Sequence, residues 1–365
     1  MSEWQTLCLK DLGKIVGGAT PPTNNPKNYG NKIAWITPKD LSTLQGRYIK
    51  KGSRSISRLG FKSCSCVLLP KHAILFSSRA PIGYVAIAKK RLCTNQDFKS
   101  IIPNKKIYFE FLYYLLKYHK NNFINMGEGT TIKGIYNVAL GLFKVKIPPT
   151  YYEQQKIART LSVLDQKIEN NHKINELLHT LAHKIYAYHF KYKPKNAKLE
   201  QIIIENPKSS IMVKNAQKTQ DKYPFFTSGD NILSYPKAII NGRNCFLNTG
   251  GNAGIKFYVG KASYSTDTWC ICANEFSDYL YLLLSSIKNH INQSFFQGTS
   301  LKHLQKNLLK KYPIYMPSAH EIKKFNQIII PLLTLISINT RTSKKLEQIR
   351  DFLLPLLLKQ QVKPQ

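Results

Sequence analysis

The chain has 365 residues and a mass of 41.8 kDa, which gives room for two or three domains that each bury a core. Its 54 basic and 20 acidic residues give a net charge of +34, and its hydrophobic fraction of 43% indicates a chain that folds. This charge favours a polyanion, nucleic acid first, although a lysine-rich proteome would contribute to the same excess. The longest apolar stretch, 328–338, is too short for a membrane span, and without an apparent signal peptide a cytoplasmic protein is expected.

The first segment, residues 1–148, combines short β-like runs with turns and is expected to form a first domain. Apolar runs at 33–36, 66–69, 73–76 and 83–88 predict strands of a mixed sheet. The run 109–116 is long and apolar enough for a buried helix. A glycine-rich turn at 127–131 and a strand at 143–147 close the segment.

A long helix is predicted over 149–192. Thr150 and Glu153 form a Thr-x-x-Glu capping box, in which the hydroxyl and the carboxylate satisfy N–H groups of the first helical turn. Apolar side chains then recur at spacings of three and four residues, with one asparagine among them. This stripe consists of Ile157, Leu161, Leu164, Ile168, Asn171 and Leu178.

The rest of the chain repeats this order. Residues 193–316 are expected to form a second domain, and 317–365 a second long helix that opens with a Ser318-x-x-Glu321 capping box. The stripe of the second helix consists of Phe325, Ile329, Leu332, Asn339 and Leu346. In both stripes the apolar positions are predicted to pack the helix pair, and the family resemblance described below implies that they also dock partner subunits.

The repeat predicts the architecture. The glycine turns at 129–133 and 298–302 lie 169 residues apart, and so do Pro148 and Pro317. We therefore expect an α/β (α+β) protein in which two similar globular domains are separated by a pair of long antiparallel helices, a coiled coil with pseudo-two-fold symmetry. About 40 residues at 1.5 Å each give helices of roughly 60 Å.

Two kinds of residue qualify this prediction. Asn171 and Asn339 occupy the same place in the two stripes and would set the register of the helices. Pro331 and Pro355 lie inside the second run and predict a kink or a break.

No catalytic or metal-binding motif stands out. The chain contains neither the Asn/Asp-Pro-Pro-Tyr motif of adenine methyltransferases nor a phosphate-binding Gly-x-x-x-x-Gly-Lys-Ser/Thr. The Cys64-x-Cys66 and Cys270-x-Cys272 pairs lack partner motifs for zinc and are expected in the core. A basic chain of this kind points to binding. The alternatives are a nuclease or methyltransferase with an unrecognised site, and a helical scaffold that binds RNA or DNA without sequence specificity.

Several stretches resemble the specificity subunit of type I restriction-modification systems. They are WITPKDL at 35–41, SRAPIG at 78–83, TNQDFKS at 94–100, the Gly-Thr-Thr turn at 129–131, PPTYYEQQKIA at 148–158 and YPFFTSG at 223–229. The resemblance covers nearly the whole chain. It implies a non-catalytic subunit with two target recognition domains, each of which reads one half of a split DNA sequence.

The resemblance also implies partners. They are double-stranded DNA, two methyltransferase subunits that grip the long helices, and restriction subunits that translocate and cleave DNA. S-adenosylmethionine, ATP and magnesium are expected on these partners, and no cofactor or metal is expected in this chain.

Residues shared by the two halves cannot discriminate between different half-sites. Thr130, Lys133 and Lys302 belong to the shared glycine turns and are expected to hold the turn or to contact phosphate. Arginine reads guanine in the major groove, and amide side chains suit adenine. The further DNA-binding candidates are Lys39, Arg47, Arg54, Arg58 and Arg79 in the first domain and Thr227, Ser228, Asn231, Arg243, Asn244 and Asn252 in the second.

Overall fold

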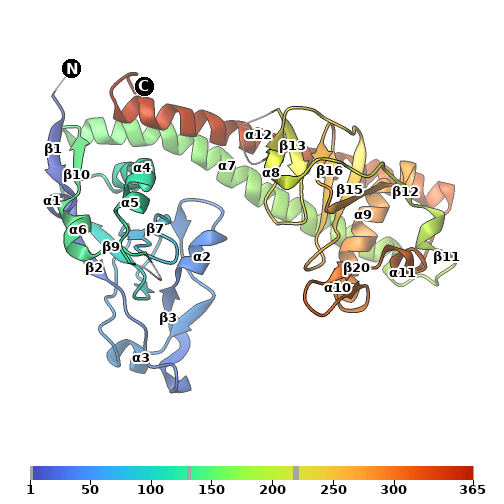
Figure 1. Ribbon diagram of the computed structural model, residues 1–365, viewed down its shortest axis with the longest axis horizontal. Helices are drawn as coiled ribbons and strands as arrows, with labels where there is room; N and C mark the ends of the chain where they lie inside the picture. The colour runs from blue at the N-terminus through green and yellow to red at the C-terminus, as the bar shows by residue number, and fades with distance from the viewer. Residues whose placement is uncertain (1–2, 130–132, 217–221, 365) are drawn as a thin grey trace. The chain divides into compact units, whose positions relative to one another are not determined.

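The structure, a computed structural model, describes residues 3–129, 133–216 and 222–364. The chain divides into two compact units, and each is described by itself. Unit 1 comprises residues 1–170 and 343–365, and unit 2 comprises 171–342. Each unit contains an α/β domain, here domain 1 and domain 2, together with part of each of two long helices (Figure 1).

In unit 1 the described strands form a five-stranded sheet of order β2-β9-β6-β7-β4, a three-stranded sheet β5-β3-β8 and a pair β1-β10. Their bounds are β1 (Gln5–Cys8), β2 (Gly13–Gly17), β3 (Tyr29–Ile36), β4 (Tyr48–Ile49), β5 (Arg54–Ile56), β6 (Ile74–Phe76), β7 (Val85–Ala88), β8 (Cys93–Thr94), β9 (Lys99–Pro103) and β10 (Lys144–Ile147). The run 66–69 is not the predicted strand, since only Leu69 pairs, in an isolated bridge to Leu92. Pro70 follows directly and has no N–H to continue a ladder.

The helices of domain 1 are α1 (Leu9–Leu12), α2 (Pro38–Ser42), α3 (Arg58–Lys62), α4 (Phe109–Tyr118), α5 (Lys120–Met126) and α6 (Asn137–Leu142), with a 3-10 turn η1 (Pro26–Asn28). The predicted buried helix at 109–116 is α4. Seven consecutive residues, 110–116, are buried, because α4 packs between the strands and the long helices in one core. That core joins Ile74 of the sheet and Phe111 of α4 to Leu161 and Leu357 of the long helices.

In unit 2 the described sheets have the orders β12-β18-β15-β16, β14-β13-β17, β11-β21 and β19-β20. The strands are β11 (Ala197–Lys198), β12 (Ile204–Glu205), β13 (Tyr223–Phe226), β14 (Leu233–Tyr235), β15 (Arg243–Asn248), β16 (Ile255–Val259), β17 (Ser263–Tyr264), β18 (Thr268–Cys272), β19 (Phe296–Gln297), β20 (His303–Leu304) and β21 (Pro313–Ile314). The helices are α8 (Val213–Ala216), α9 (Ser277–Ser286), α10 (Lys288–Ser294) and α11 (Lys306–Lys310), with short turns η2 (Ala187–Lys191), η3 (Leu199–Gln201) and η4 (Asn274–Phe276).

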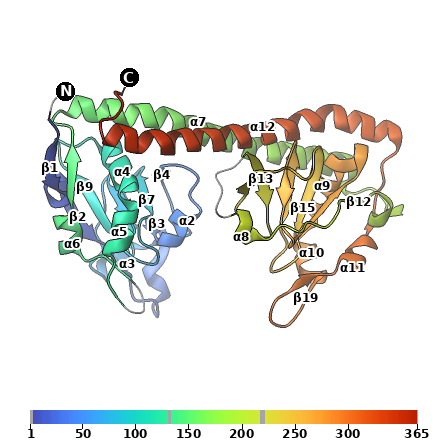
Figure 2. The ribbon, with the colours of Figure 1, turned by 45° about the horizontal axis from the view of Figure 1, so that its top comes forward.

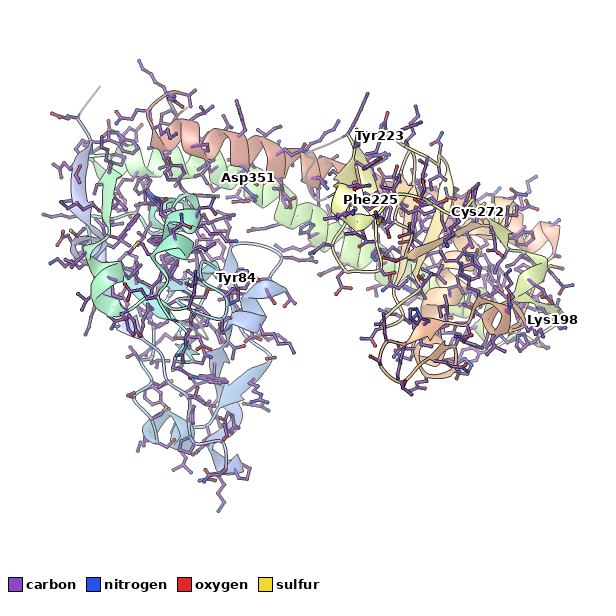
Figure 3. All side chains as sticks on the ribbon, viewed as in Figure 1. Tyr84, Lys198, Tyr223, Phe225, Cys272 and Asp351 are labelled. Atoms are coloured by element: carbon purple, nitrogen blue, oxygen red, sulfur yellow. The ribbon has the colours of Figure 1, made fainter. Side chains whose placement is uncertain are left out.

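The predicted duplication is confirmed in the strand order. The series β2-β9-β6-β7 of domain 1 corresponds to β12-β18-β15-β16 of domain 2, and β4 is the additional strand of domain 1. In the smaller sheets β3 pairs with β8, and β13 with β17, in parallel. The aromatic side chains of β13, among them Phe225, are seen in Figure 3.

The long helices are α7 (Tyr151–Tyr186) and α12 (Ala319–Leu358). At the start of α12 the predicted capping box forms, since the Ser318 N–H donates to Glu321 Oε2 at 2.9 Å and the Glu321 N–H donates to Ser318 Oγ at 3.4 Å. At the start of α7 the Glu153 N–H donates to Thr150 Oγ1 at 3.2 Å, and the Thr150 hydroxyl donates to Glu153 Oε2 at 3.1 Å. In each unit α7 and α12 run side by side and antiparallel (Figure 2), because the start of one helix shares a unit with the end of the other. Of the kink or break predicted at Pro331 and Pro355, the break is wrong, because α12 continues through both prolines, and the kink stays a prediction.

A polar contact lies in the helix pair of unit 2. Asn339 Nδ2 donates to Asn175 Oδ1 at 2.9 Å, and Asn175 Nδ2 lies 3.4 Å from both the Ile336 carbonyl and Thr340 Oγ1. Asn339 therefore faces α7 as predicted, but its partner is Asn175, one turn beyond Asn171. An asparagine pair of this kind disfavours shifted registers, since a slip leaves its amides unpaired.

Candidate nucleic-acid interface

Four segments of each domain meet where strands end. We name the meeting points junction 1 (residues 36–37, 77–79, 95–98 and 133–135) and junction 2 (residues 226–228, 248–250, 265–268 and 302–304). In domain 1 they follow the carboxyl ends of β3, β6 and β8, and in domain 2 those of β13, β15 and β17. Because β3 runs parallel to β8, and β13 to β17, these ends lie together.

Backbone and hydroxyl groups hold junction 1 together. The Asn95 N–H donates to the Ile36 carbonyl at 3.0 Å. The N–H and the hydroxyl of Ser78 both donate to the Asp97 carbonyl, at 2.8 and 3.0 Å. The Ile135 N–H, beyond the glycine turn, donates to the Ser78 carbonyl at 3.0 Å.

Junction 2 repeats these bonds one for one. The Ser265 N–H donates to the Phe226 carbonyl at 2.9 Å. The N–H and the hydroxyl of Thr249 donate to the Asp267 carbonyl at 3.2 and 2.8 Å, and the Leu304 N–H donates to the Thr249 carbonyl at 3.0 Å. The two domains thus share one backbone frame at this point, and any difference in what they recognise must come from side chains placed on it.

Arg79 is the clearest such difference. In domain 1, Arg79 forms a β-bridge to Gly134. In domain 2 the corresponding bridge joins Gly250 to His303, so Gly250 stands at the position of Arg79. The Arg79 guanidinium pairs with the Asp97 carboxylate, whose second oxygen accepts from Asn95 Nδ2 at 2.6 Å. The Arg79 side chain remains 43% exposed, so the ion pair orients the guanidinium and leaves part of it accessible to a ligand.

Gln96 is a candidate that the sequence reasoning missed. It is exposed between Asn95 and Asp97, and its side-chain oxygen accepts a hydrogen bond from the Thr20 hydroxyl. An exposed amide suits the edge of an adenine. A sequence signal for Gln96 exists, because this residue belongs to the TNQDFKS run that resembles the family. The candidates predicted for domain 1 were basic residues and a threonine, so an amide in that domain was not among them.

Beside junction 2 a half-buried lysine of β16 shapes the turn after β13. Lys256 Nζ donates to the carbonyls of Thr227 and Gly229 at 2.8 and 2.7 Å, and burial lowers the pKa of this ammonium group. The Thr227 hydroxyl accepts from the Gly229 N–H at 3.1 Å, and the Ser228 hydroxyl donates to the Asp267 carbonyl. Both hydroxyls, predicted to contact DNA, are therefore engaged in holding the turn.

The basic stretch 39–58 is organised by Asp40. Its carboxylate accepts from the N–H groups of Thr37 and Ser53 at 2.8 and 2.7 Å. Burial opposes ionisation of Asp40, but these hydrogen bonds outweigh it and lower the pKa. The Ser53 bond draws the loop before β5 back onto the start of α2. Lys39, Arg54 and Arg58 are exposed on this stretch, as a contact with DNA requires.

Two predicted DNA contacts, Arg47 and Asn244, are buried, and a third, Arg243, is half-buried and bound to protein groups. Arg47 is 3% exposed, and its Nη1 donates to Glu110 Oε1 at 2.8 Å. Asn244 is also buried, where its Oδ1 accepts from the Asn206 amide at 2.9 Å. Arg243 pairs with the buried Asp278 carboxylate, and its Nη1 donates to Thr334 Oγ1 at 2.9 Å. Because these groups bind protein partners, we correct their role to a structural one.

The remaining candidates lie on loops. Lys133 and Lys302 are exposed beside the shared turns, and Asn231 and Asn252 are exposed in loops of domain 2. Thr130 lies outside the described residues. Whether these side chains contact DNA stays a prediction.

The two stripes on the long helices pack inward. Ile157, Leu161 and Ile168 of α7 are buried, and Phe325 and Ile329 of α12 are buried against Tyr279 of α9 in the core of unit 2. The half-buried members are Leu164, Asn171, Leu178, Leu332, Asn339 and Leu346. This placement suits the packing of helices and domains but leaves little of the stripes for a partner subunit.

A second set of apolar side chains faces outward on the same helices. We name it the outer stripe; it consists of Val163, Ile174, Leu177 and Leu181 on α7 and Ile328, Leu335, Ile338, Ile349 and Phe352 on α12. Leu177 is 70% and Phe352 is 68% exposed. Successive members on each helix are three, four, seven or eleven residues apart, so neighbours share a helix face. Such exposed apolar faces mark protein contacts.

The described part of the chain offers no other obvious chemistry. Within it, no three His, Cys, Asp or Glu side chains come together as metal ligands would. None of its helices is long and apolar enough to cross a membrane. Cys66 and Cys270 are buried as expected, whereas Cys64 and Cys272, also expected in the core, are half-buried.

Comparison with known proteins decides the family. The family model described as type I restriction modification DNA specificity domain matches residues 1–180 and 195–348, one copy for each half. A type I restriction enzyme MjaIX specificity subunit from Methanocaldococcus jannaschii is 31% identical, over 98% of this chain and 93% of its own length. The chain belongs to the type I DNA specificity subunit family. The specificity subunit is accordingly a non-catalytic component and no enzyme by itself.

Two further relatives agree with this assignment. The HindI specificity subunit of Haemophilus influenzae is 33% identical to this chain in a region that covers 31% of this chain and 24% of the HindI subunit. A crystal structure of the S subunit of the type I restriction-modification system of M. genitalium covers 97% of this chain and 96% of its own, with a TM-score of 0.63 and 18% identity. At this identity the likeness shows that the fold is shared.

Proposed function

We propose that this specificity subunit recognises a bipartite DNA target, with one half read by each domain, and directs adenine methylation and restriction by partner subunits. The observation that carries the proposal is the matched bonding of the two junctions. Matching frames present different groups: the half-buried Arg79 and the exposed Gln96 in domain 1, and the half-buried Gly250 and Thr266 at the corresponding positions of domain 2. A duplicated frame with unlike side chains suits two unlike half-sites.

The charge supplies affinity without sequence information. The net charge of +34 attracts the phosphate backbone. The exposed Lys133 and Lys302 belong to the two junctions and the exposed Lys39 follows junction 1 closely in the chain, so these lysines would position the duplex. Arg79 would discriminate through a guanine edge and Gln96 through an adenine edge. Affinity should therefore fall steeply with salt, whereas the preference for particular bases should not.

The outer stripe supports the proposal of helical partners. We expect two methyltransferase subunits to cover it, since its apolar side chains are exposed on α7 and α12. Restriction subunits would join the same complex. S-adenosylmethionine, ATP and magnesium would be held by these partners, in the cytoplasm, and the chain itself would hold none.

Mapping of protected and methylated DNA tests the function. The chain, assembled with its methyltransferase subunits, should protect two short specific tracts separated by a gap of unspecified sequence. Methyltransferase subunits without this chain provide the control and should show no such pattern. One contiguous specific tract would contradict the proposal.

A further inference from the structure

A buried ionic cluster joins domain 1 to the long helices within unit 1. Arg47, at the end of the loop before β4, lies between Glu110 of α4 and Glu169 of α7. Arg47 Nη1 donates to Glu110 Oε1 at 2.8 Å, and Arg47 Nε donates to Glu169 Oε1 at 3.1 Å. On the next turn of α7, Asp165 accepts from Arg350 Nη1 of α12 at 2.7 Å. We name these five residues the Arg47 cluster.

Tyrosines complete the bonding of its acids. Glu110 accepts from the Tyr48 hydroxyl at 2.6 Å and from the Tyr108 hydroxyl at 2.8 Å. Asp165 accepts from the Tyr114 hydroxyl at 2.5 Å. Burial alone would lower the pKa of the Arg47 guanidinium, but Tyr114, Glu169 and Glu110 raise it above its ordinary value. The arginine therefore stays charged, and the cluster is a fully bonded group of opposite charges.

The cluster fixes the main chain as well as side chains. Glu169 Oε1 also accepts from the backbone N–H of Arg47 at 2.9 Å. Gly46 has a φ of +134°, and a Cβ at this position would lie 3.1 to 3.3 Å from the Glu169 carboxyl group. The loop can approach α7 this closely because residue 46 has no side chain. Glu169 thus holds the middle of the basic stretch 39–58 against the helix.

Buried ionic clusters of this kind fix the relative positions of the segments that they join more than they stabilise the fold. Desolvation of buried charges offsets most of their attraction, so apolar residues of equal volume often stabilise a fold as well. Ion pairs with several bonds per group do, however, admit one arrangement only, because a shift of the helix leaves charges unpaired. Glu169 and Asp165 are one helical turn apart, and together they tie both the loop before β4 and α12 to the same face of α7.

Domain 2 is tied to its helix differently. The acid that corresponds to Glu110 is Asp278 of α9, and it pairs with Arg243 from β15. On the long helix the partner of Arg243 is the neutral hydroxyl of Thr334. The Val259 N–H at the end of β16 adds a bond to Ser337 Oγ at 3.1 Å. Domain 2 also meets one carboxylate of a long helix, because Glu321 in the first turn of α12 pairs with Lys193 and accepts from the Tyr315 hydroxyl at 2.8 Å. Within the described residues, however, an arginine held by acids of α7 is found only in domain 1.

We propose that Glu169, with Asp165, is a positioning residue that sets the orientation of domain 1 on α7 and thereby the gap length that the complex accepts between half-sites. This inference rests on the proposed function, since a gap exists only in a bipartite target. The exposed candidates of domain 1 do not touch Glu169, so its replacement should change where domain 1 is held and leave what it reads unchanged.

The test uses the complete chain assembled with its methyltransferase subunits. The wild-type target is first mapped, and methylation rates are then measured on duplexes whose gap is native, one base pair shorter or one longer. Glu169→Gln should reduce the preference for the native gap by roughly tenfold, within the range of coupling in buried networks. Base preference in both half-sites should stay as in the wild type. Glu176→Gln, at an exposed glutamate of α7, is the matched control and should keep the native gap preference.

Two outcomes would overturn the inference. One is a folded Glu169→Gln complex with an unchanged gap preference, and the other is a loss of base preference in the half-site of domain 1. A merely structural role would lower the melting temperature and slow methylation equally at every gap length. If Glu169→Gln does not fold, Gly46→Ala displaces the same loop from Glu169 and should relax the gap in the same way. A wild-type target without a gap would contradict the proposed function itself, before any variant is compared.

Discussion

Arg79 and Gly250 occupy the same backbone position in the two domains. Each follows a hydroxyl residue bonded to an aspartate carbonyl, and each forms an isolated bridge to a residue beyond a glycine turn. This position therefore carries a long hydrogen-bonding side chain, that of arginine, in domain 1, and it carries no side chain in domain 2. A duplicated chain can in this way keep its frame and still present two unlike surfaces to DNA.

Arg79→Ala should relax recognition of one half-site. Loss of a bidentate arginine contact costs about 1 to 3 kcal/mol of discrimination against a wrong base. Methylation of target libraries should therefore show a broadened base in one half, while the preference of domain 2 survives. Arg91→Ala removes the same charge from an exposed turn of domain 1 and serves as the control. Unaltered specificity in Arg79→Ala would exclude the contact.

The converse substitution, Gly250→Arg, should add a preference in the half-site of domain 2. A Cβ at Gly250 would meet only the His303 ring, at 3.9 Å and beyond, so the new side chain fits without displacing the backbone. Selection from a randomised half-site should show a base preference that the wild type lacks. An unchanged profile would mean that this position does not face DNA.

Leu177→Glu should weaken assembly with a methyltransferase subunit. Leu177 is 70% exposed, so the free energy of unfolding should change by no more than about 0.5 kcal/mol. The cost appears only when a partner covers the charge. Titration calorimetry with the methyltransferase subunit measures it, and Thr180→Glu, on the flank of the same helix, is the comparison. Equal affinity for both variants would place the partner elsewhere.

Arg47→Met should destabilise unit 1. The substitution leaves Glu110 and Glu169 buried without their cation, and breaking a buried pair in this way costs about 3 to 5 kcal/mol. Urea unfolding of the whole chain gives the value. Arg159→Met, at an exposed arginine of α7, should change it by about 0.5 kcal/mol or less. A similar small effect in Arg47→Met would show that the acids find other partners.

Glu321 should make the stability of the folded chain fall at acidic pH. Hydrogen bonds from Lys193, the Ser318 N–H and the Tyr315 hydroxyl lower the pKa of Glu321 to about 2, from an ordinary value of 4.5. Its contribution is present above about pH 4.5 and is lost as the pH falls towards about 2. Melting temperatures of Glu321→Gln should therefore fall less over this window than those of the wild type. Glu200→Gln, at an exposed glutamate, should retain the wild-type dependence.

The duplicated fold could be predicted because its signals are local and occur twice. The Thr150 and Ser318 caps, the aromatic helices and the glycine turns each depend on residues a few positions apart. The accessibility of arginines could not be predicted in this way. Arg47 and Arg79 look alike in the sequence, but Glu110 and Glu169, which lie 63 and 122 positions from Arg47, bury one of them.

The register of the helix pair likewise depends partly on local signals and partly on contacts between residues far apart in the sequence. The seam position of Asn339 followed from its stripe, but its partner Asn175 depends on how two segments 164 positions apart are aligned. The outer stripe was overlooked for a different reason. Residues such as Ile174 and Leu177 alternate with the buried positions, and periodicity alone does not tell an inward face from a face kept for a partner.

The unlike attachments of the two domains bear on how recognition modules can be exchanged. A graft of the domain 2 type onto the first position brings no strand corresponding to β4 and no arginine corresponding to Arg47, so Glu169 would be left without its cation. Successful chimaeras should therefore either carry the loop 44–49 with the host helix or replace Glu169 by a neutral residue. An exchange of the first recognition domain thus requires that the new domain supply a cation for Glu169 of α7, or that Glu169 be replaced together with the domain.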